Sequence, residues 1–560
     1  MHTRDTRDTM STTTKPSRTL LVWIRHELRV RDNPLLSPAT ALPRLSKEQH
    51  DQFQRLVPVF VLDPRQLSGQ THEFGLARYS SHRSRFLFEA LSDLKSSLQR
   101  LGSDLVIRSG TPSEVLAAVA KDTGATDAVW AFHVGTEEAA DAQSTREALG
   151  NVGVAVHPDL WDMTLLNPLD LPFTDIKKNL PLTFTGFRKA VEARRDGIKV
   201  RPIVRVDRVL PLPPQLNPGE VPSELPDEID SGWAVDALGK DFRVKVHEGI
   251  DGRQSRFTGG ETVAQGRIED WFWTRDALRR YKETRNGLLG DGYASQLSPY
   301  LALGCISARS IYWEVKRYER ERGLQGNENT YWLIFELLWR DYFKFLGVRL
   351  GASLFHLHGG HEQQHHGGYH HPWSRDGILF RKWCLGETGF DLIDAAMNEL
   401  RVTGFMSNRM RQVVASFLTK DLGLDWRLGA EWFESQLVDS DVTSNYGNWQ
   451  YVAGVGVDPR ENRYFNLDKQ AMTYDPDRLF RTAWLGNRSP TAVRKCIDRL
   501  GTFSPSKMVA GDGDEGSKRV RPANHQQHLS NAQRKAMTNR NAKSGGRDIR
   551  QFFHNAKEDC

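Results

Sequence analysis

Two aspartates in an apolar setting are the first residues of this chain that could do chemistry. Asp439 and Asp441 lie one residue apart at the end of a run whose apolar residues, among them Phe433 and Leu437, have helical spacing. A carboxylate in apolar surroundings is costly unless a cation or hydrogen-bond donors receive it. The run therefore predicts either a functional site or a helix C-terminus with solvated acids, and this window alone does not separate the two.

Cations that could receive these carboxylates lie on two other helical patterns. Arg340 follows Glu336 by four residues and adjoins Trp339, in a run whose aromatic residues on every side favour a buried helix over a surface ion pair. Asn408 and Arg411 lie on a second pattern of the same kind. Because a buried arginine needs an acid as much as a buried acid needs a cation, we predict that these helices meet the two aspartates.

A third run, 293–307, carries hydroxyl and amide side chains where an anion could bind. Ser295, Gln296 and Ser298 precede Pro299 at a predicted helix start. Hydroxyls and backbone N–H groups at a helix start can bind phosphate, although serine there more often acts as an ordinary cap. Together the three runs suit one large, flat ligand that carries phosphate.

The elements that must position these residues begin with an α/β pattern. Continuous apolar runs alternate with amphipathic helical patterns, which predicts a doubly wound parallel sheet in a domain over 18–165. The usual dinucleotide fingerprint, GxGxxG, is absent from the sequence. The strands are expected at 19–25, 56–62, 104–107, 128–132 and 152–156, and the helices at 84–101 and 112–123.

The second half of the chain is predicted to be all-α. A proline-rich stretch, 166–255, is expected to be an extended inter-domain linker. The helical domain follows over 256–484 and begins with a capping box between Thr258 and Glu261. Its clearest helical patterns are at 307–322, 329–349, 389–402, 407–420 and 429–438.

The terminal segments and the composition limit the partners. Residues 485–560 hold 15 Lys and Arg against 7 Asp and Glu, so a net charge of +8 belongs to a tail that is predicted to be disordered, as are residues 1–17. Such a tail can attract phosphate non-specifically.

The four cysteines have no metal-ligand spacing, and seven histidines at 356–371 are irregularly spaced, so we expect no metal site. We expect no membrane span and an intracellular, reducing compartment, with nucleus or cytoplasm favoured and the mitochondrion as the alternative.

Several long blocks of the sequence resemble the photolyase/cryptochrome family. In chain order they are WIRHELRVRDNPLL, YKETRNG (281–287), QLSPYLALGCIS, FELLWRDYFKF, the stretch 403–451 that begins TGFMSNRMRQ and ends SNYGNWQY, and VDPRENRYFN (457–466). The resemblance covers about 20–484. The blocks YKETRNG, WQY and VDPRENRYFN are similar specifically to the cryptochrome DASH branch.

This resemblance implies an all-α domain that binds FAD and, in this branch, methenyltetrahydrofolate as an antenna pigment. Glu137 matches an acid that binds the antenna, although a solvated glutamate at a helix start has the same appearance. Ala294 departs from the Ser or Thr that is usual at the first position of the phosphate loop. The positions that match FAD contacts are Tyr281, Ser295, Gln296, Leu297, Ser298, Arg340, Asn408, Arg411, Asp439, Asp441 and Asn445.

The resemblance also implies roles around the flavin. Asn445 would face flavin N5, where an amide can donate or accept a hydrogen bond. Asp441 and Arg411 would form an ion pair beside the flavin ring. An electron-transfer chain from the surface to the flavin would consist of Trp383, Trp426 and Trp449, whereas the residues alone suggest only core tryptophans.

The implied activity is blue-light-driven repair of cyclobutane pyrimidine dimers by electron transfer from reduced FAD. Glu336 matches the acid that contacts the dimer, and Trp339 matches the aromatic residue that stacks on it. Asn408, Arg411 and Asn445 complete the implied catalytic set. The alternative is a blue-light photoreceptor that signals and has little repair activity.

Two positions limit the implied substrate. Tyr451 stands where photolyases of duplex DNA carry a second tryptophan, which favours dimers in single-stranded or locally unpaired DNA, with RNA as a further candidate. Ser407 and Asn408 stand where (6-4) photolyases carry histidines, so we expect no (6-4) repair because general-acid help is missing. We expect a monomer.

Overall fold

A computed structural model describes residues 17–71, 73–193, 197–223, 257–359, 372–456 and 464–485. The chain divides into two compact units, 1–500 and 501–560, and all the described residues lie in the first. The predictions made for residues 1–16, for most of the basic tail, for five of the seven histidines and for most of VDPRENRYFN lie outside the described residues.

The first part of the chain forms a five-stranded sheet in the order β3-β2-β1-β4-β5, and every neighbouring pair is parallel. The central strand is buried throughout from Leu20 to Ile24. A strand covered on both faces needs apolar side chains at every position, which explains the continuous apolar run. The predicted doubly wound parallel sheet is thus confirmed. The strands are β1 (Arg18–Ile24), β2 (Phe53–Leu62), β3 (Val106–Ser109), β4 (Asp127–Trp130) and β5 (Ala155–Val156).

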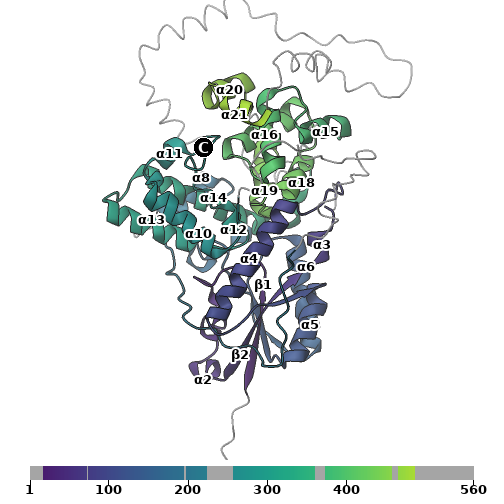
Figure 1. Ribbon diagram of the computed structural model, residues 1–560, viewed down its shortest axis with the longest axis vertical. Coiled ribbons are helices and arrows are strands. Elements are labelled where there is room, and N and C mark those ends of the chain that lie inside the picture. The colour runs from purple at the N-terminus through teal and green to yellow at the C-terminus, as the bar shows by residue number, and fades with distance from the viewer. Residues whose placement is uncertain are drawn as a thin grey trace, which may run out of the picture. The chain divides into compact units, whose positions relative to one another are not determined.

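Helices cover both faces of this sheet (Figure 1). Alternate residues of β1 point to opposite faces. Leu20 and Val22 pack in a cluster with the apolar face of α4 (Ser81–Arg100), whereas Leu21 and Trp23 pack in a second cluster with α5 (Pro112–Thr123) and α6 (Thr136–Asn151). The first face is the one that also meets the helical part of the chain.

The helical part follows the predicted patterns closely. The pattern predicted at 407–420 ends as an α-helix at Ser416 and continues as a π-helical turn over Phe417–Asp421. Among the described residues, no helix is long and apolar enough to span a membrane. The longer helices are α10 (Glu261–Ile268), α13 (Ala308–Arg322), α14 (Glu328–Leu350), α15 (Gly377–Leu385), α16 (Asp391–Thr403), α17 (Asn408–Ser416), α18 (Trp426–Gln436), α19 (Val442–Ala453), α20 (Leu467–Tyr474) and α21 (Leu479–Leu485).

Shorter helical turns join these elements. They are α1 (Pro38–Ala41), α2 (Lys47–His50), α3 (Pro64–Leu67), α7 (Ile176–Asn179), α11 (Tyr281–Thr284) and α12 (Ser298–Ala302), with further tight turns at Pro34–Leu36, Pro168–Asp170, Ala277–Arg280 and Gly351–Phe355 and a π-helical turn at Glu269–Thr274.

Two local predictions are wrong. The capping box between Thr258 and Glu261 does not form, because the cap of α10 is Gly260 and the Glu261 carboxylate instead accepts from the backbone N–H groups of Val30 and Arg31 at 2.7 and 2.9 Å. The stretch predicted as an extended linker contains a helix, α8 (Phe184–Glu192). The apolar spacing of α8 is helical, and its buried side chains join the main core.

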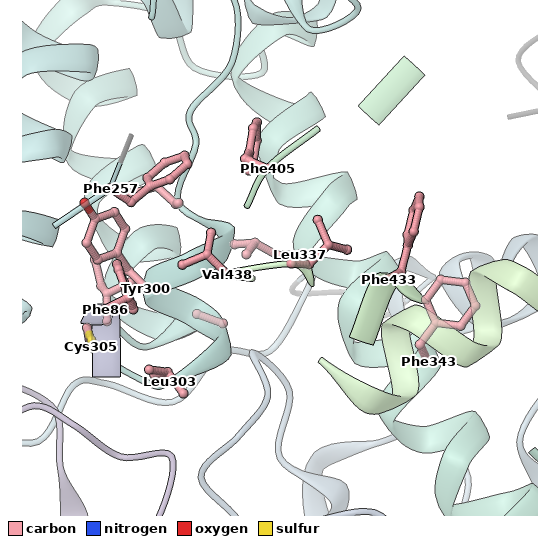
Figure 2. Close-up of a cluster of buried hydrophobic side chains, with 14 of the residues drawn as sticks. Phe86, Phe257, Tyr300, Leu303, Cys305, Leu337, Phe343, Phe405, Phe433 and Val438 are labelled. Atoms are coloured by element: carbon pink, nitrogen blue, oxygen red, sulfur yellow. The ribbon is translucent and has the colours of Figure 1, made fainter. Parts of the chain in front are cut away.

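One apolar core joins the sheet to the helical part. Phe86 of α4 packs on Tyr300 of α12 with ring centroids 5.4 Å apart, and Phe257 packs on Phe405 at 5.0 Å. Figure 2 shows these side chains with Leu337 and Phe343 of α14 and Phe433 of α18. The sheet and the helical part therefore share one core, and polar side chains at their junction are held in place from both sides.

Candidate functional site

Asp439 is held by Arg411, a cation predicted as a partner of the aspartates, and by Ser298, which was predicted to bind phosphate instead. Arg411 Nη2, on α17, lies 2.8 Å from Asp439 Oδ2 and 3.1 Å from Oδ1. The Ser298 hydroxyl, at the start of α12, donates to Asp439 Oδ2 at 2.6 Å. Because the Asp439 carboxylate is buried, this ion pair gives it the partners that the sequence predicted it would need. The predicted meeting of the helices that bear cations with the two aspartates is confirmed.

Asp441 has a different cation. Lys344 Nζ, on α14, lies 2.7 Å from Asp441 Oδ2, and Arg340 Nη2 lies 4.0 Å from the same atom. Asp441 also caps α19, where its Oδ1 accepts from the Ser444 N–H at 3.0 Å. Although burial alone would raise the pKa of Asp441, Lys344, Arg340 and this backbone N–H together hold it well below its usual value.

The implied pairing of Arg411 with Asp441 is therefore wrong. As the cap of α19, Asp441 turns its carboxylate toward the start of that helix, where Lys344 reaches it. Asp439 comes two residues earlier and faces α17 instead. The Arg340 guanidinium donates mainly to backbone oxygens, those of Met163 and, at 3.2 Å, of Leu301.

The loop before α12 combines a strained residue with an unused donor. Gln296 has a φ of 55°, in the left-handed region that a residue other than glycine adopts at a cost. Its side-chain nitrogen is buried and has no hydrogen-bond partner among the described residues. The loop is nevertheless fixed, because Arg267 donates to the backbone oxygens of Ala294 and Ser295 at 3.0 Å each. The adjoining Leu297 is buried. A buried donor on a fixed, strained loop indicates a ligand that the loop receives.

The two predicted asparagines differ in environment. Asn445, on α19, is buried, and its side-chain nitrogen donates to the Ala430 backbone oxygen at 2.8 Å. Asn408 is exposed at the start of α17, directly after the cap Ser407. The bond to Ala430 orients the Asn445 amide, so its oxygen is the atom available to accept a hydrogen bond from a ligand.

Glu336 and Trp339 lie three residues apart on α14 and therefore share one face of the helix. Tyr281 donates its hydroxyl hydrogen bond to Glu336, and Arg285 Nη1 lies 3.5 Å from Glu336 Oε1. Desolvation raises the pKa of Glu336, against the attraction of Arg285. The alternative to a buried helix was a surface ion pair between Glu336 and Arg340, and the structure does not support it, because Glu336 contacts Tyr281 and Arg285 while Arg340 donates to backbone oxygens.

Trp339 lies between two other aromatic rings. Its ring stacks on Phe184 of α8 with centroids 3.7 Å apart and planes at 12°, and Tyr451 approaches edge-on at 6.0 Å and 68°. Phe184 was missed because its segment was interpreted as a linker. The apolar spacing of Phe184, Phe187 and Val191 would have identified the helix that carries it.

The three predicted relay tryptophans are all buried. Trp383 and Trp449 meet edge-on with centroids 6.2 Å apart. Trp449 lies so close to α18 that a Cβ at Gly429 would stand 2.1 Å from its ring, and Trp426 lies one turn earlier on the same helix. Trp383, Trp426 and Trp449 are each at most 2% exposed, so the expectation that one of them lies at the surface is wrong.

A fourth tryptophan was missed by the sequence analysis. Trp373 is partly exposed, and its neighbour Ser374 accepts a backbone hydrogen bond from Asp425 at 2.8 Å, next to Trp426. Trp373 therefore lies next to a residue that is hydrogen-bonded beside Trp426 and, unlike Trp383, it is not fully buried.

A cavity of about 100 Å³ lies where the sheet meets α4, α14 and the start of α19. Glu137 lines it, but its side chain is 54% exposed and pairs with Arg78 at 2.6 Å. The neighbouring Glu138 also lines the cavity, and burial raises its pKa, which favours a protonated carboxyl that can donate. Glu138 was missed because it adjoins an equally acidic residue and no sequence pattern separates the two.

The buried Glu431 on α18 should make the free energy of unfolding depend on pH. It accepts from the Thr71 hydroxyl and from the Phe74 N–H at 3.2 Å, and burial raises its pKa from 4.5 to about 7. The folded chain holds the Glu431 proton more tightly than the unfolded chain does, so protonated Glu431 stabilises the fold. This stabilisation is complete below about pH 4.5 and is lost as the pH rises through about 7. Glu431→Gln should therefore remove about 2.5 kcal/mol of the decline in unfolding free energy between pH 5 and pH 8, measured by urea unfolding.

Asp341 provides the internal control for that measurement. Burial raises its pKa to about 7 as well, so a residual decline should persist in Glu431→Gln. An unchanged pH profile in Glu431→Gln would contradict the assignment.

Two family models match the chain. The FAD binding domain of DNA photolyase matches residues 332–508, and the DNA photolyase domain matches 20–207. The first range covers the helical part from α14 onward, and the second covers the sheet domain with part of the segment that follows it.

Individual relatives match over most of their length. Cryptochrome DASH, chloroplastic/mitochondrial, of Arabidopsis thaliana is 43% identical over 505 residues, which cover 89% of this chain and 82% of the relative. Cryptochrome DASH of Xenopus laevis is 42% identical over 474 residues, 84% of this chain and 83% of the relative. The crystal structure of a Synechocystis cryptochrome superposes with a TM-score of 0.72 at 40% identity and covers 86% of this chain and 91% of its own. By its sheet domain, its FAD-binding helical domain and these relatives, the chain belongs to the photolyase/cryptochrome family, in its cryptochrome DASH branch.

Proposed function

We propose that this chain repairs cyclobutane pyrimidine dimers under blue light, preferentially in single-stranded DNA. The observation that carries the proposal is the face of α14 on which Glu336 and Trp339 stand together. Phe184 covers one face of the Trp339 ring, which leaves the side toward Tyr451 for stacking. Burial makes the protonated form of Glu336 easier to reach, and in that form the carboxyl can donate to a pyrimidine carbonyl. A dimer that has left the base stack needs both kinds of contact.

The residues fit an FAD cofactor. The strained loop with the unused Gln296 donor suits the phosphates or ribose of a dinucleotide, and the charged Arg411–Asp439 pair suits a flavin ring whose charge changes. Asn445 offers an oriented amide oxygen. Bound, reduced FAD supplies the electron that, under blue light, opens the cyclobutane ring.

The protein side chains have separate tasks in this proposal. Glu336 orients the dimer and stabilises negative charge that develops on it, because a nearby hydrogen-bond donor favours a charged oxygen. Trp339 holds the dimer by stacking. The tryptophans Trp449 and Trp426, with Trp373 as an outer member, supply the electrons that keep the cofactor reduced.

Tyr451 is the residue to which we assign the preference for single strands. Its ring meets Trp339 edge-on, so the stacking wall for a dimer is one large ring and one smaller, more polar ring. Weaker stacking offsets less of the energy needed to take a dimer out of a duplex, whereas in a single strand little unpairing is needed.

The test is light-dependent repair by the full chain loaded with FAD and reduced. Oligonucleotides that contain one cyclobutane dimer are given as single strands and as duplexes, in blue light and in darkness. We expect repair only in light and faster on the single strand. Absence of light-dependent reversal on the single strand would refute the repair activity and favour the photoreceptor alternative.

Tyr451→Trp should relax the substrate preference. A second large ring adds stacking worth about 1 kcal/mol, so repair of the duplex should rise by about fivefold while repair of the single strand changes little. Tyr451→Phe, which keeps the ring size, is the matched control and should show no gain on the duplex. Equal rates on duplex and single strand in the unaltered chain would already contradict the role given to Tyr451.

The antenna and the compartment are proposed on narrower grounds. A methenyltetrahydrofolate antenna would occupy the cavity lined by Glu138, whose protonated carboxyl can donate to a ring nitrogen. Folate release on denaturing the purified chain tests whether the antenna is bound.

A mitochondrial compartment is supported by the name of the Arabidopsis thaliana relative, and imaging of the tagged full chain would decide between mitochondrion, nucleus and cytoplasm.

A further inference from the structure

A buried tyrosine on α19 is paired with a carboxylate beside one of the relay tryptophans. The Tyr446 hydroxyl donates to Glu434 Oε2 at 3.1 Å. The Tyr446 ring meets the Trp426 ring edge-on, with centroids 6.2 Å apart and planes at 81°. All three residues are buried, so the donor, the proton acceptor and the tryptophan form one compact group away from bulk water.

Packing alone does not account for the pair. Phe355 covers another side of the Tyr446 ring, with centroids 4.9 Å apart, and a phenylalanine at 446 would fill the same ring space. The hydroxyl and the carboxylate instead add a desolvation cost that an apolar pair would avoid. Burial and the negative charge of Glu434 raise the pKa of Tyr446 well above its usual value, so the ring is a neutral phenol. Such a phenol is a useful electron donor only if a base takes its proton as the electron leaves.

We propose that Tyr446 reduces oxidised Trp426 in a proton-coupled step with Glu434 as the base. The proposal rests on the relay of the proposed function, in which light leaves Trp426 one electron short as a radical cation. One electron passes from Tyr446 to Trp426, and the phenolic proton passes to the Glu434 carboxylate. The products are neutral Trp426, a neutral tyrosyl radical and a protonated Glu434. A hydrogen atom from an external thiol restores the phenol and leaves a thiyl radical.

The proton on Glu434 has a route out. Glu434 lines the cavity described above together with Arg78 and Glu137. Arg78 Nη2 lies 3.6 Å from Glu434 Oε1 and 2.6 Å from Glu137 Oε2, and the Glu137 side chain is 54% exposed. Glu434 can therefore pass the proton past Arg78 toward the exposed Glu137 carboxylate and from there to bulk water.

The test follows radicals in the full chain loaded with oxidised FAD, by flash absorption and by electron paramagnetic resonance of samples frozen after blue light. The unaltered chain should show a tryptophan radical that converts to a tyrosyl radical, more slowly in D2O. Tyr446→Phe should abolish the tyrosyl signal and lengthen the life of the tryptophan radical by at least about tenfold, equivalent to 1.4 kcal/mol in barrier. Glu434→Gln keeps Tyr446 but removes the base, so the conversion should slow by a similar factor.

Tyr464→Phe is the matched control, because Tyr464 also donates to a carboxylate, that of Asp421 at 3.2 Å, but is 57% exposed. It should leave both radicals unchanged. A tryptophan radical that never becomes a tyrosyl radical, or a tyrosyl signal that survives in Tyr446→Phe, would overturn the inference and leave the relay standing. Absence of any tryptophan radical in the unaltered chain would overturn both.

Discussion

Arg411→Met is expected to lower the free energy of unfolding by about 3 kcal/mol and to weaken FAD retention. The substitution leaves the Asp439 carboxylate buried with the Ser298 hydroxyl as its remaining described hydrogen-bond donor. Loss of one partner from a buried ion pair typically costs this much, because the other charge stays desolvated. Urea unfolding of the purified chain gives the first quantity, and flavin absorbance after dialysis gives the second.

Two further variants separate the charge from the shape of Arg411. Arg411→Lys keeps the charge but cannot reach both carboxylate oxygens with one planar group, so we expect about a third of the loss. Asp439→Asn combined with Arg411→Met should cost much less than the two single losses added together, since neither charge is then left unpaired. Strict additivity in this double-mutant cycle would contradict the pairing of Arg411 with Asp439.

Glu336→Ala is expected to slow light-dependent repair of a single-stranded dimer by about 10-fold to 100-fold. The carboxyl would contribute a hydrogen bond that strengthens as charge develops on the pyrimidine, and such bonds are worth about 1.5–3 kcal/mol. The rate is measured under single-turnover conditions with reduced, FAD-loaded protein.

Glu336→Gln is the matched control for that loss. The amide keeps a donor of the same reach, so most of the repair rate should remain. Because Glu336 also accepts from Tyr281, the unfolding free energy and FAD content of both variants must be compared with those of the unaltered chain. A wild-type repair rate in Glu336→Ala would remove Glu336 from the dimer site.

The secondary structure was largely predictable because its signals are local. The apolar run at 19–25 predicted β1 because a strand buried on both faces needs apolar residues throughout. The pattern at 329–349 predicted α14 within a residue at each end. Prediction failed where a competing contact came from a distant segment. The Glu261 carboxylate, for example, accepts from the backbone N–H groups of Val30 and Arg31 and therefore does not cap its own helix.

The sequence by itself determined which kinds of residue had to meet: buried acids required cations, and the long matching blocks identified the family. It could not decide which acid meets which cation, because Asp439 and Asp441 are chemically alike and only the turn into α19 directs one to Arg411 and the other to Lys344. Only the tertiary structure brought Phe184 against Trp339 and Glu434 against Tyr446 beside Trp426. Periodicity along the chain specifies which face of a helix is buried, whereas the partner on that face depends on how distant helices approach one another.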